Sequence, residues 1–204
     1  CNKNKYNVIA LTAYKNYKKL AKLAIMFNCK YAVIGQKKYF KNLTEELFAT
    51  NIKCLAGDKA ILEVSSLNVD ILVSAVVGIA GLKPTFASIG NTKILAIANK
   101  ESIISAGYLL IKKAKLKKTK IIPLDSEHNA IYQILQNENK KNIKNIVLTA
   151  SGGPFLRMNK KNFKNITVAD ALKHPNWKMG KKITIDSATL VNKVIEVIEA
   201  SILF

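Results

Sequence analysis

The chain has 204 residues, of which 49% are hydrophobic, and it carries a formal net charge of +20. This length and apolar content can bury a substantial core, so we expect a folded protein of one large domain or one and a half smaller ones. The longest nearly uncharged apolar run, 69–82, is shorter than the roughly 20 residues that span a bilayer. We therefore expect no membrane segment.

The positive charge is spread along the chain. Lysines recur among Asn and Ile in most segments, and Arg157 is the only arginine. Nucleic-acid-binding proteins gather their cations on one face, so this distribution favours a solvated basic surface over a nucleic-acid site. The same field would attract small phosphorylated ligands.

The cysteines and the chain ends add two expectations. Cys1, Cys29 and Cys54 form no CxxC pair, which predicts buried or incidental thiols in a reducing compartment, with neither a disulfide framework nor a zinc site. The sequence opens on Cys1 and stops at Phe204 inside a helical pattern. We therefore expect a partial product, truncated at both ends.

Short apolar runs alternate with amphipathic segments in the first two thirds of the chain. We expect strands within 6–13, 31–35, 69–78 and 93–98, and helices within 16–27, 37–49, 82–89 and 99–115. Continuous Val, Ile and Leu runs between helices indicate parallel strands, so the pattern predicts a doubly wound, Rossmann-like α/β sheet. Strands resume within 120–127 and 145–151, and 161–177 and 185–200 then predict helix, loop and helix.

Polar residues and glycines follow several of these predicted strands, where ligands of such sheets bind. Gly78 and Gly81 end one strand, Asn99, Lys100 and Glu101 end another, and the segments "LDSE" (124–127) and "TASGG" (149–153) end two more. Each has a simpler explanation as a turn glycine or a helix cap. Because four strand ends share this character, we treat them as candidate site segments.

The carboxylates suggest a metal site. Asp125 and Glu127 are two residues apart at a predicted strand end, so in extended geometry their side chains project to the same side. Asn192 and Glu196 are four apart on a predicted helix and share a face, beside Lys193. An all-oxygen set of this kind favours Mg²⁺ or Mn²⁺ over zinc. Salt bridges from the carboxylates to lysines are the alternative.

The two histidines are interpreted differently. His128 would point away from the carboxylate pair if the strand continued, so we expect it to be structural. His174 opens a segment in which Trp177, Met179 and Gly180 are typical of a lid that excludes water when it closes. A surface loop anchored by a buried Trp is the alternative.

The stretch "LTASGGPF", 148–155, ends an apolar run in a hydroxyl residue and two glycines. Such a backbone can present N–H groups to an anion, so we expect a phosphate here. The candidate phosphate ligands are Ser151, Gly152 and Gly153 from this loop and Ser187, Asn192 and Lys193 from the later helix.

Four motifs carry a resemblance to a known family. "IANKES", "PLDSEHNAIYQ", "LTASGGPF" and "HPNWKMGKKITIDSATLVNKVIEVIEA" occur in this order, which resembles the 1-deoxy-D-xylulose 5-phosphate reductoisomerases. The resemblance extends over nearly the whole chain. It implies NADPH- and metal-dependent rearrangement and reduction of that phosphorylated sugar to 2-C-methyl-D-erythritol 4-phosphate, in isoprenoid biosynthesis. It also implies a homodimer in a bacterial cytoplasm or a plastid, with neither nucleic-acid nor membrane partners.

The resemblance further implies a role for each motif residue. Metal ligands would be Asp125, Glu127 and Glu196, and Lys100 and Ser126 would contact the substrate's hydroxyl and carbonyl end. The substrate phosphate would be held by Ser151, Ser187, Asn192 and Lys193, with His174 closing over it and Trp177 and Met179 descending as a lid. Cofactor contacts would come from Tyr14, Lys15, Asn16, Asn99, Glu101, Met179 and Gly180. The implied domains are a partial NADPH-binding domain, 1–124, and a partial catalytic domain, 125–204.

The chain also departs from the family pattern. It contains no G-x-T-G-S-x-G phosphate loop, so half of the dinucleotide site is missing from these residues. Tyr14, Lys178 and Val194 stand where the family commonly has Gly, Ser and Gly. Two alternatives therefore stay open: a non-catalytic remnant of the enzyme, and a basic nucleic-acid-binding α/β module.

Overall fold

The structure is a computed structural model that describes residues 5–150, 152–175 and 180–204. The strands are β1 (Ala10–Ala13), β2 (Tyr31–Ile34), β3 (Lys53–Ala56), β4 (Val69–Ser74), β5 (Thr92–Ile97) and β6 (Lys120–Pro123). The helices are α1 (Tyr17–Phe27), α2 (Phe40–Glu46), α3 (Asp58–Ser65), α4 (Leu82–Ser88), α5 (Lys100–Lys117), α6 (Ser126–Leu135), α7 (Val168–Ala171), α8 (Lys181–Ala188) and α9 (Val191–Leu203). Short 3₁₀ turns lie at Lys37–Tyr39, Ile79–Gly81, Lys140–Asn142 and Lys160–Asn165.

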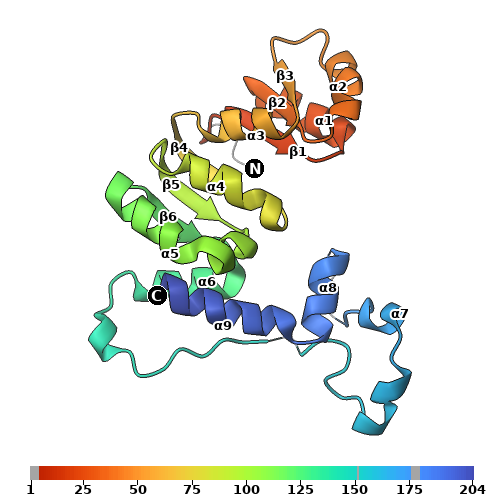
Figure 1. Ribbon diagram of the computed structural model, residues 1–204, viewed down its shortest axis with the longest axis vertical. Coiled ribbons are helices and arrows are strands. Elements are labelled where there is room, and N and C mark those ends of the chain that lie inside the picture. Colours follow the sequence, from red (N-terminus) through yellow and green to blue (C-terminus); the bar gives the residue numbers. More distant parts are fainter. Residues whose placement is uncertain (1–4, 151, 176–179) are drawn as a thin grey trace.

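The strands form two parallel sheets, in the orders β1-β2-β3 and β4-β5-β6. Figure 1 shows the first sheet with α1–α3 at one end of the molecule, the second sheet with α4 and α5 in the middle, and α6–α9 at the other end. Helices flank both sheets, so the predicted α/β class with parallel strands is confirmed.

The first sheet is covered on both faces because alternate residues of β2 point in opposite directions. Ala32 and Ile34 lie in one apolar cluster with residues of α1 and α2. Val33, between them, lies in a second cluster with Ala60 and Val64 of α3. This explains why β2 is a continuous apolar run.

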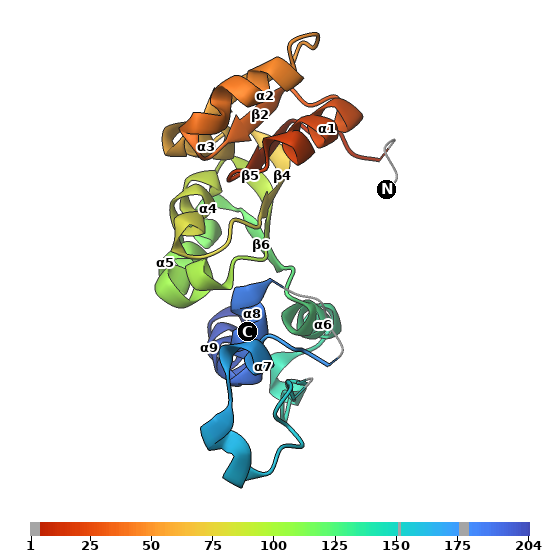
Figure 2. The ribbon, with the colours of Figure 1, turned by 90° about the vertical axis from the view of Figure 1, so that its right-hand side faces the viewer.

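The second sheet holds a separate core. Leu95 of β5 packs in one cluster with Ile103 and Leu110 of α5, and Figure 2 shows α4 and α5 on the same side of this sheet. Ile71 and Val73 of β4 remain exposed. The core of this part of the chain therefore lies between the sheet and its two helices.

Helix α9 is positioned by close packing on α5. Ile202 and Leu203 pack against the second core, and a Cβ built on Gly107 would lie only 2.6 Å from Cγ2 of Ile202. Helix α5 kinks at Ala106, whose φ is −147°. Because position 107 has no side chain, α9 can lie directly on α5, next to the residues that begin α5.

Three local predictions are corrected by the structure. Residues 145–150 are irregular rather than a strand, since the described residues provide no strand to pair with them. The predicted helix 185–200 is two helices, broken at Leu190, whose φ is +59°. Strand β3 and helix α3 were not anticipated. None of the helices in the described ranges is long and apolar enough to cross a membrane.

The thiols that the structure describes follow the prediction. Cys29 is buried and Cys54 is half-buried, and both are free. Burial raises the pKa of each thiol above its ordinary value. Cys1 lies outside the described residues.

Candidate active site

Three carboxylates meet where the second sheet reaches α9. Asp125 follows β6 as the N-cap residue of α6, Glu127 lies in the first turn of α6, and Glu196 lies on α9. One oxygen of each lies within 4.8 Å of the others. The expectation that an extended strand aligns Asp125 with Glu127 is wrong, because α6 begins at Ser126. The helix turn brings the two together instead.

Two lysines are paired with these carboxylates. The Nζ atom of Lys100, the first residue of α5, lies 2.9 Å from Oδ2 of Asp125 and 3.8 Å from Oε1 of Glu196. It also donates to Oδ1 of Asn192 at 2.8 Å. Lys193 donates to Oε1 of Glu127 at 3.1 Å and to Oε2 of Glu196. The salt bridges proposed as the alternative are thus present in the same cluster.

These contacts shift two of the pKa values. Burial alone would raise the pKa of Asp125, but contacts with His128 and Lys100 outweigh it and hold the value well below the ordinary range. Burial alone would lower the pKa of Lys193, but the carboxylates of Glu196 and Glu127 outweigh it and raise the value. Asp125 and Lys193 are therefore both charged at neutral pH.

His128 lies beside the carboxylates, although the predicted strand had it pointing away from them. It is fully buried in α6, and its Nδ1 lies 3.6 Å from Oδ1 of Asp125 and 3.5 Å from Oε2 of Glu199. Glu199 was missed, although its spacing of three from Glu196 places both on one face of α9. The strand assumed at 120–127 pointed His128 away from the carboxylates, and α6 turns it toward them.

His128 and Glu199 are in close contact without a hydrogen bond between them. The backbone carbonyl oxygen of Glu196 lies 2.9 Å from Nε2 of His128, so Nε2 must donate there. Nδ1 then faces the carboxylates of Asp125 and Glu199, and neither Nδ1 nor Oε2 of Glu199 has a hydrogen-bond partner among the described residues. A proton on Nδ1 or on Glu199 would lessen the repulsion within this buried group. Burial raises the pKa of Glu199 to about 7, and Asp125 leads the contacts that raise the pKa of His128 against the opposing effect of burial.

The carboxylate cluster fits a hard divalent cation. Asp125, Glu127 and Glu196 provide oxygen ligands only, which suits Mg²⁺ or Mn²⁺. Glu196 is almost fully buried, and it turns both oxygens toward polar partners in the cluster, namely Asn192 and Lys193. The geometry thus provides a pre-formed set of ligands whose charge is balanced by lysines.

The candidate phosphate ligands converge in part. Gly153 adopts φ +64° and packs so closely on the end of α8 that a Cβ there would lie 2.9 Å from the carbonyl oxygen of Ser187. Asn192 and Lys193 lie just beyond, in the first turn of α9, which begins at Val191. The structure therefore brings the glycine loop to Ser187. Ser151 lies outside the described residues.

The candidate cofactor residues fall into two groups. Tyr14, Lys15 and Asn16 follow β1 in the first sheet, where Tyr14 is exposed and Asn16 caps α1 by accepting from the backbone N–H of Lys19. The second group, Asn99, Glu101 and Gly180, lies where α5 and α8 begin.

A lysine connects the members of this second group. Lys182 pairs with Glu101 at 3.1 Å and with Asp186 at 2.8 Å, so the start of α8 is tied to the start of α5. The side chain of Asn99 is buried and holds the preceding loop by donating to the carbonyl of Gly78 at 2.9 Å. It also accepts from the backbone N–H of Ser102.

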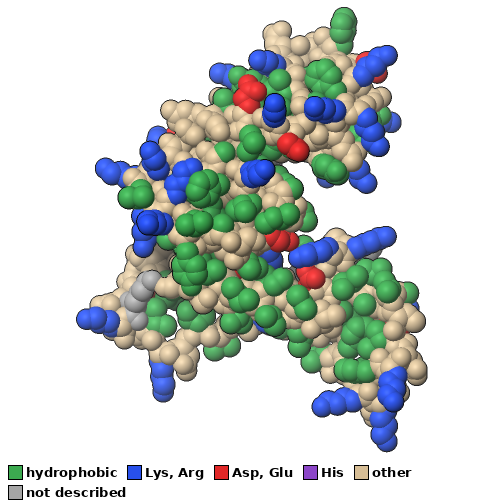
Figure 3. All heavy atoms as spheres, in the orientation of Figure 1, with side chains coloured by type: hydrophobic (Ala, Val, Ile, Leu, Met, Phe, Trp, Pro, Cys, Tyr) green, Lys and Arg blue, Asp and Glu red, His purple; other side chains and the backbone are tan. Residues whose placement is uncertain are grey.

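The predicted lid segment is described only at its ends. His174 is half-buried, Gly180 is exposed, and Trp177 and Met179 lie outside the described residues. Figure 3 shows the surface hollowed between the helices of the second sheet and α8, with acidic and basic side chains next to each other on its walls. The segment 174–180 leads directly into α8.

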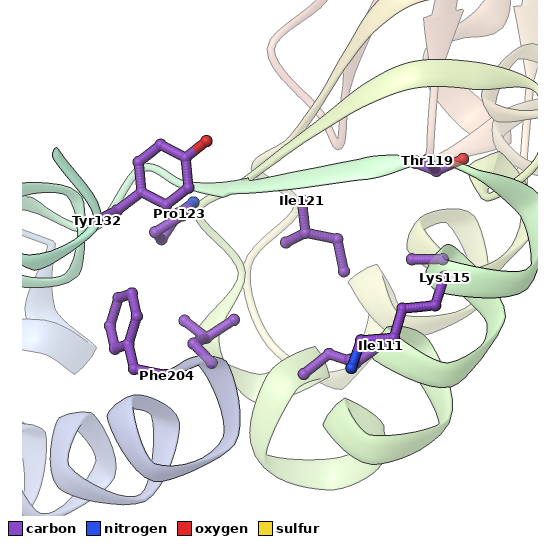
Figure 4. Close-up of a pocket in the computed structure, with 9 residues that line it drawn as sticks. Ile111, Lys115, Thr119, Ile121, Pro123, Tyr132 and Phe204 are labelled. Atoms are coloured by element: carbon purple, nitrogen blue, oxygen red, sulfur yellow. The ribbon is translucent and has the colours of Figure 1, made fainter. Parts of the chain in front are cut away.

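A cavity of about 190 Å³ lies elsewhere, between α5, β6 and the end of α9. Figure 4 shows Tyr132 and Phe204 on one side of it and Ile111 and Lys115 on the other. None of its lining residues is a predicted site residue. It is mainly apolar, so we do not assign the chemistry to it.

Comparison with known proteins agrees with the sequence motifs. The family model for 1-deoxy-D-xylulose 5-phosphate reductoisomerase matches residues 1–107, and the model for the C-terminal domain of that enzyme matches residues 121–204. The enzyme of Wolbachia pipientis subsp. Culex pipiens is 52% identical over 99% of the chain, and that of Ehrlichia canis is 50% identical over 98%. The chain spans about half the length of these relatives, 52% of each.

Solved structures give the same result. The reductoisomerase of Zymomonas mobilis in complex with NADPH superimposes with a TM-score of 0.91 at 42% identity, covering 99% of this chain and 52% of that one. A DOX-P reductoisomerase in complex with NADPH, fosmidomycin and magnesium has a TM-score of 0.90 at 41% identity, covering 98% and 52%. The chain belongs to the 1-deoxy-D-xylulose 5-phosphate reductoisomerase family.

Proposed function

We propose that the protein containing this chain converts 1-deoxy-D-xylulose 5-phosphate to 2-C-methyl-D-erythritol 4-phosphate, with NADPH and Mg²⁺ or Mn²⁺, in isoprenoid biosynthesis. One observation carries the proposal: oxygens of Asp125, Glu127 and Glu196 lie within 4.8 Å of one another, with two lysines at the same cluster. The solved relatives with NADPH and with magnesium support both cofactors.

Each part of the site would have a distinct task. Asp125, Glu127 and Glu196 would hold the cation, which when bound polarises the carbonyl and neighbouring hydroxyl of a sugar phosphate as a Lewis acid. Lys100 and Ser126 would orient that end of the substrate. The phosphate would be held by Ser151, Ser187, Asn192 and Lys193. The segment with His174, Trp177 and Met179 would act as a lid that excludes water from the bound substrate.

The cofactor and the domains complete the proposal. Residues 1–124 would belong to the NADPH-binding domain and 125–204 to the catalytic domain. Tyr14, Lys15, Asn16, Asn99, Glu101, Met179 and Gly180 would contact the dinucleotide. The protein would work as a homodimer in a bacterial cytoplasm or a plastid; the relatives named above come from bacteria.

Replacement of a ligand carboxylate tests the proposal. Asp125→Asn or Glu127→Gln should lower the substrate-dependent oxidation of NADPH by orders of magnitude, because each removes a charged ligand while keeping the side-chain shape. Asp70→Asn is the matched control, since Asp70 pairs with Lys93 on the surface. Unchanged turnover in both site variants, or no turnover by the unmodified protein, would refute the proposal.

A further inference from the structure

Each carboxylate of the cluster already has an ammonium partner. Lys193 connects Glu127 to Glu196, and Lys100 connects Asp125 to Glu196. The side chains of both lysines are largely buried, with 19% and 12% of their surface exposed. Ion pairs held this far from water are screened less than surface pairs, so the two lysines act as internal counter-ions of the cluster.

A divalent cation needs the same oxygens. If it is held by Glu127 and Glu196, it competes with the ammonium of Lys193, because two cations cannot share one pair of carboxylates without strong repulsion. Lys100 differs from Lys193 in one respect. It also donates to the neutral side chain of Asn192 and would keep this partner. The described contacts of the Lys193 ammonium are Glu127 and Glu196 alone, so Lys193 is the lysine that must move.

The released ammonium lies near the candidate phosphate ligands. Lys193 is in the first turn of α9, where its backbone N–H donates to the carbonyl of Leu190 at 3.0 Å. The turn that ends at Leu190 includes Ser187, against which Gly153 packs. Once the ammonium of Lys193 is released from the carboxylates, it is the nearest charged donor on α9 for an anion bound at this loop.

We propose that Lys193 couples the binding of a divalent cation to the binding of a phosphate or phosphonate group. Without the cation, Lys193 neutralises Glu127 and Glu196; with the cation bound, it is free to hold the anion. This inference deepens the proposed function and rests on its metal site. Because coupling between two ligands is reciprocal, the anion should strengthen cation binding by the same factor as the cation strengthens anion binding.

The test is Mn²⁺ binding, measured from the EPR signal of free Mn²⁺ at pH 8 with and without propylphosphonate, which carries no chelating group for the metal. In the unmodified protein, propylphosphonate should tighten Mn²⁺ binding by about fivefold or more. Lys193→Met should bind Mn²⁺ roughly tenfold more tightly without the phosphonate, because the competing charge-assisted bonds are gone. The phosphonate should then have no effect.

Two further variants make the result specific. Lys93→Met removes one positive charge from the surface, where Lys93 pairs with Asp70, so it should behave as the unmodified protein and controls for a general change of charge. Lys193→Gln is a second variant at the same position in case the Met variant folds poorly. Weaker or unchanged Mn²⁺ binding in the position 193 variants, or a phosphonate effect that persists in them, would overturn the coupling. If the unmodified protein does not bind Mn²⁺ at all, the proposed metal site itself is refuted.

Discussion

The buried pair of His128 and Glu199 lies beside the carboxylate cluster and should give folding stability a specific pH dependence. The pKa of Glu199 is raised to about 7 from an ordinary value of 4.5, so the folded state holds its proton more tightly than the unfolded state. The stability that this provides is fully present below about pH 4.5 and is lost as pH rises through 7. The raised pKa of His128 acts in the same direction.

Glu199→Gln tests this effect because the amide keeps the neutral form at every pH. In EDTA, the free energy of unfolding of the unmodified protein should fall between pH 5 and 8, with Glu199 contributing on the order of 3 kcal/mol. The variant should show a flatter curve, and urea unfolding at intervals of one pH unit measures both. Parallel curves for the two proteins would mean that Glu199 does not hold the proton.

The carboxylates were selected because oxygen ligands suit a hard cation. Asp125 and Glu127 were placed together on the assumption of an extended strand, which is incorrect. Three acidic residues without cysteine partners indicate a hard cation whatever the backbone does. The side on which Asp125 and Glu127 project depends on whether 125–127 is strand or helix, and there the apolar run through Pro123 was misleading. The same error hid His128. Its burial against Glu199 depends on α6 meeting α9, which spacing along one chain does not specify.

At the scale of elements, the contact of α5 with α9 sets the geometry of the site, since Lys100 begins one helix and Glu196 lies on the other. Gly107→Ala should therefore be harmful, although alanine normally favours a helix by about 1 kcal/mol over glycine. The added Cβ would lie 2.6 Å from Cγ2 of Ile202. This methyl is attached to a branched Cβ, whose side-chain rotation is restricted in a helix. We expect a loss of about 1–3 kcal/mol in the free energy of unfolding and weaker Mn²⁺ binding.

A double-mutant cycle provides the control for this prediction. Ile202→Ala removes the methyl that Gly107→Ala would strike, so the double variant should lose less stability than the sum of the two single variants. Denaturant unfolding of the four proteins measures the coupling. Additive effects would show that the packing of α9 on α5 does not depend on a glycine at position 107.

Elements with strong local patterns were predicted well, and those that depend on distant partners were not. The amphipathic segments 16–27 and 99–115 correspond closely to α1 and α5, because each presents an apolar face and an Asn cap. Residues 145–150 have the apolar pattern of a strand, but strand pairing needs a neighbour. No Gly or Pro marks the break at Leu190. The apolar periodicity therefore predicted one helix across this position.

The whole molecule has separate apolar cores. Leu43 belongs to the cluster around the first sheet, and Leu95 belongs to the cluster around the second sheet, α5 and the end of α9. The two sheets share no hydrogen-bonded strand pair within the described residues. Figure 1 shows them following one another along the long axis. Each sheet therefore has its own core, and we expect a core substitution to act most strongly on the sheet to which it belongs, the candidate metal site lying beside the second.

Leu43→Ala and Leu95→Ala form a matched pair for this expectation, since both leucines are fully buried. Each substitution should cost about 2–5 kcal/mol in the part to which it belongs. Leu43→Ala should lower the denaturant midpoint of the first part and leave Mn²⁺ affinity unchanged. Leu95→Ala should weaken Mn²⁺ binding as well, because β5 supports α5 and hence Lys100 and α9. Hydrogen exchange resolved along the chain, together with Mn²⁺ titration, distinguishes the two parts. Equal loss of Mn²⁺ affinity in both variants would show that the cores unfold as one unit.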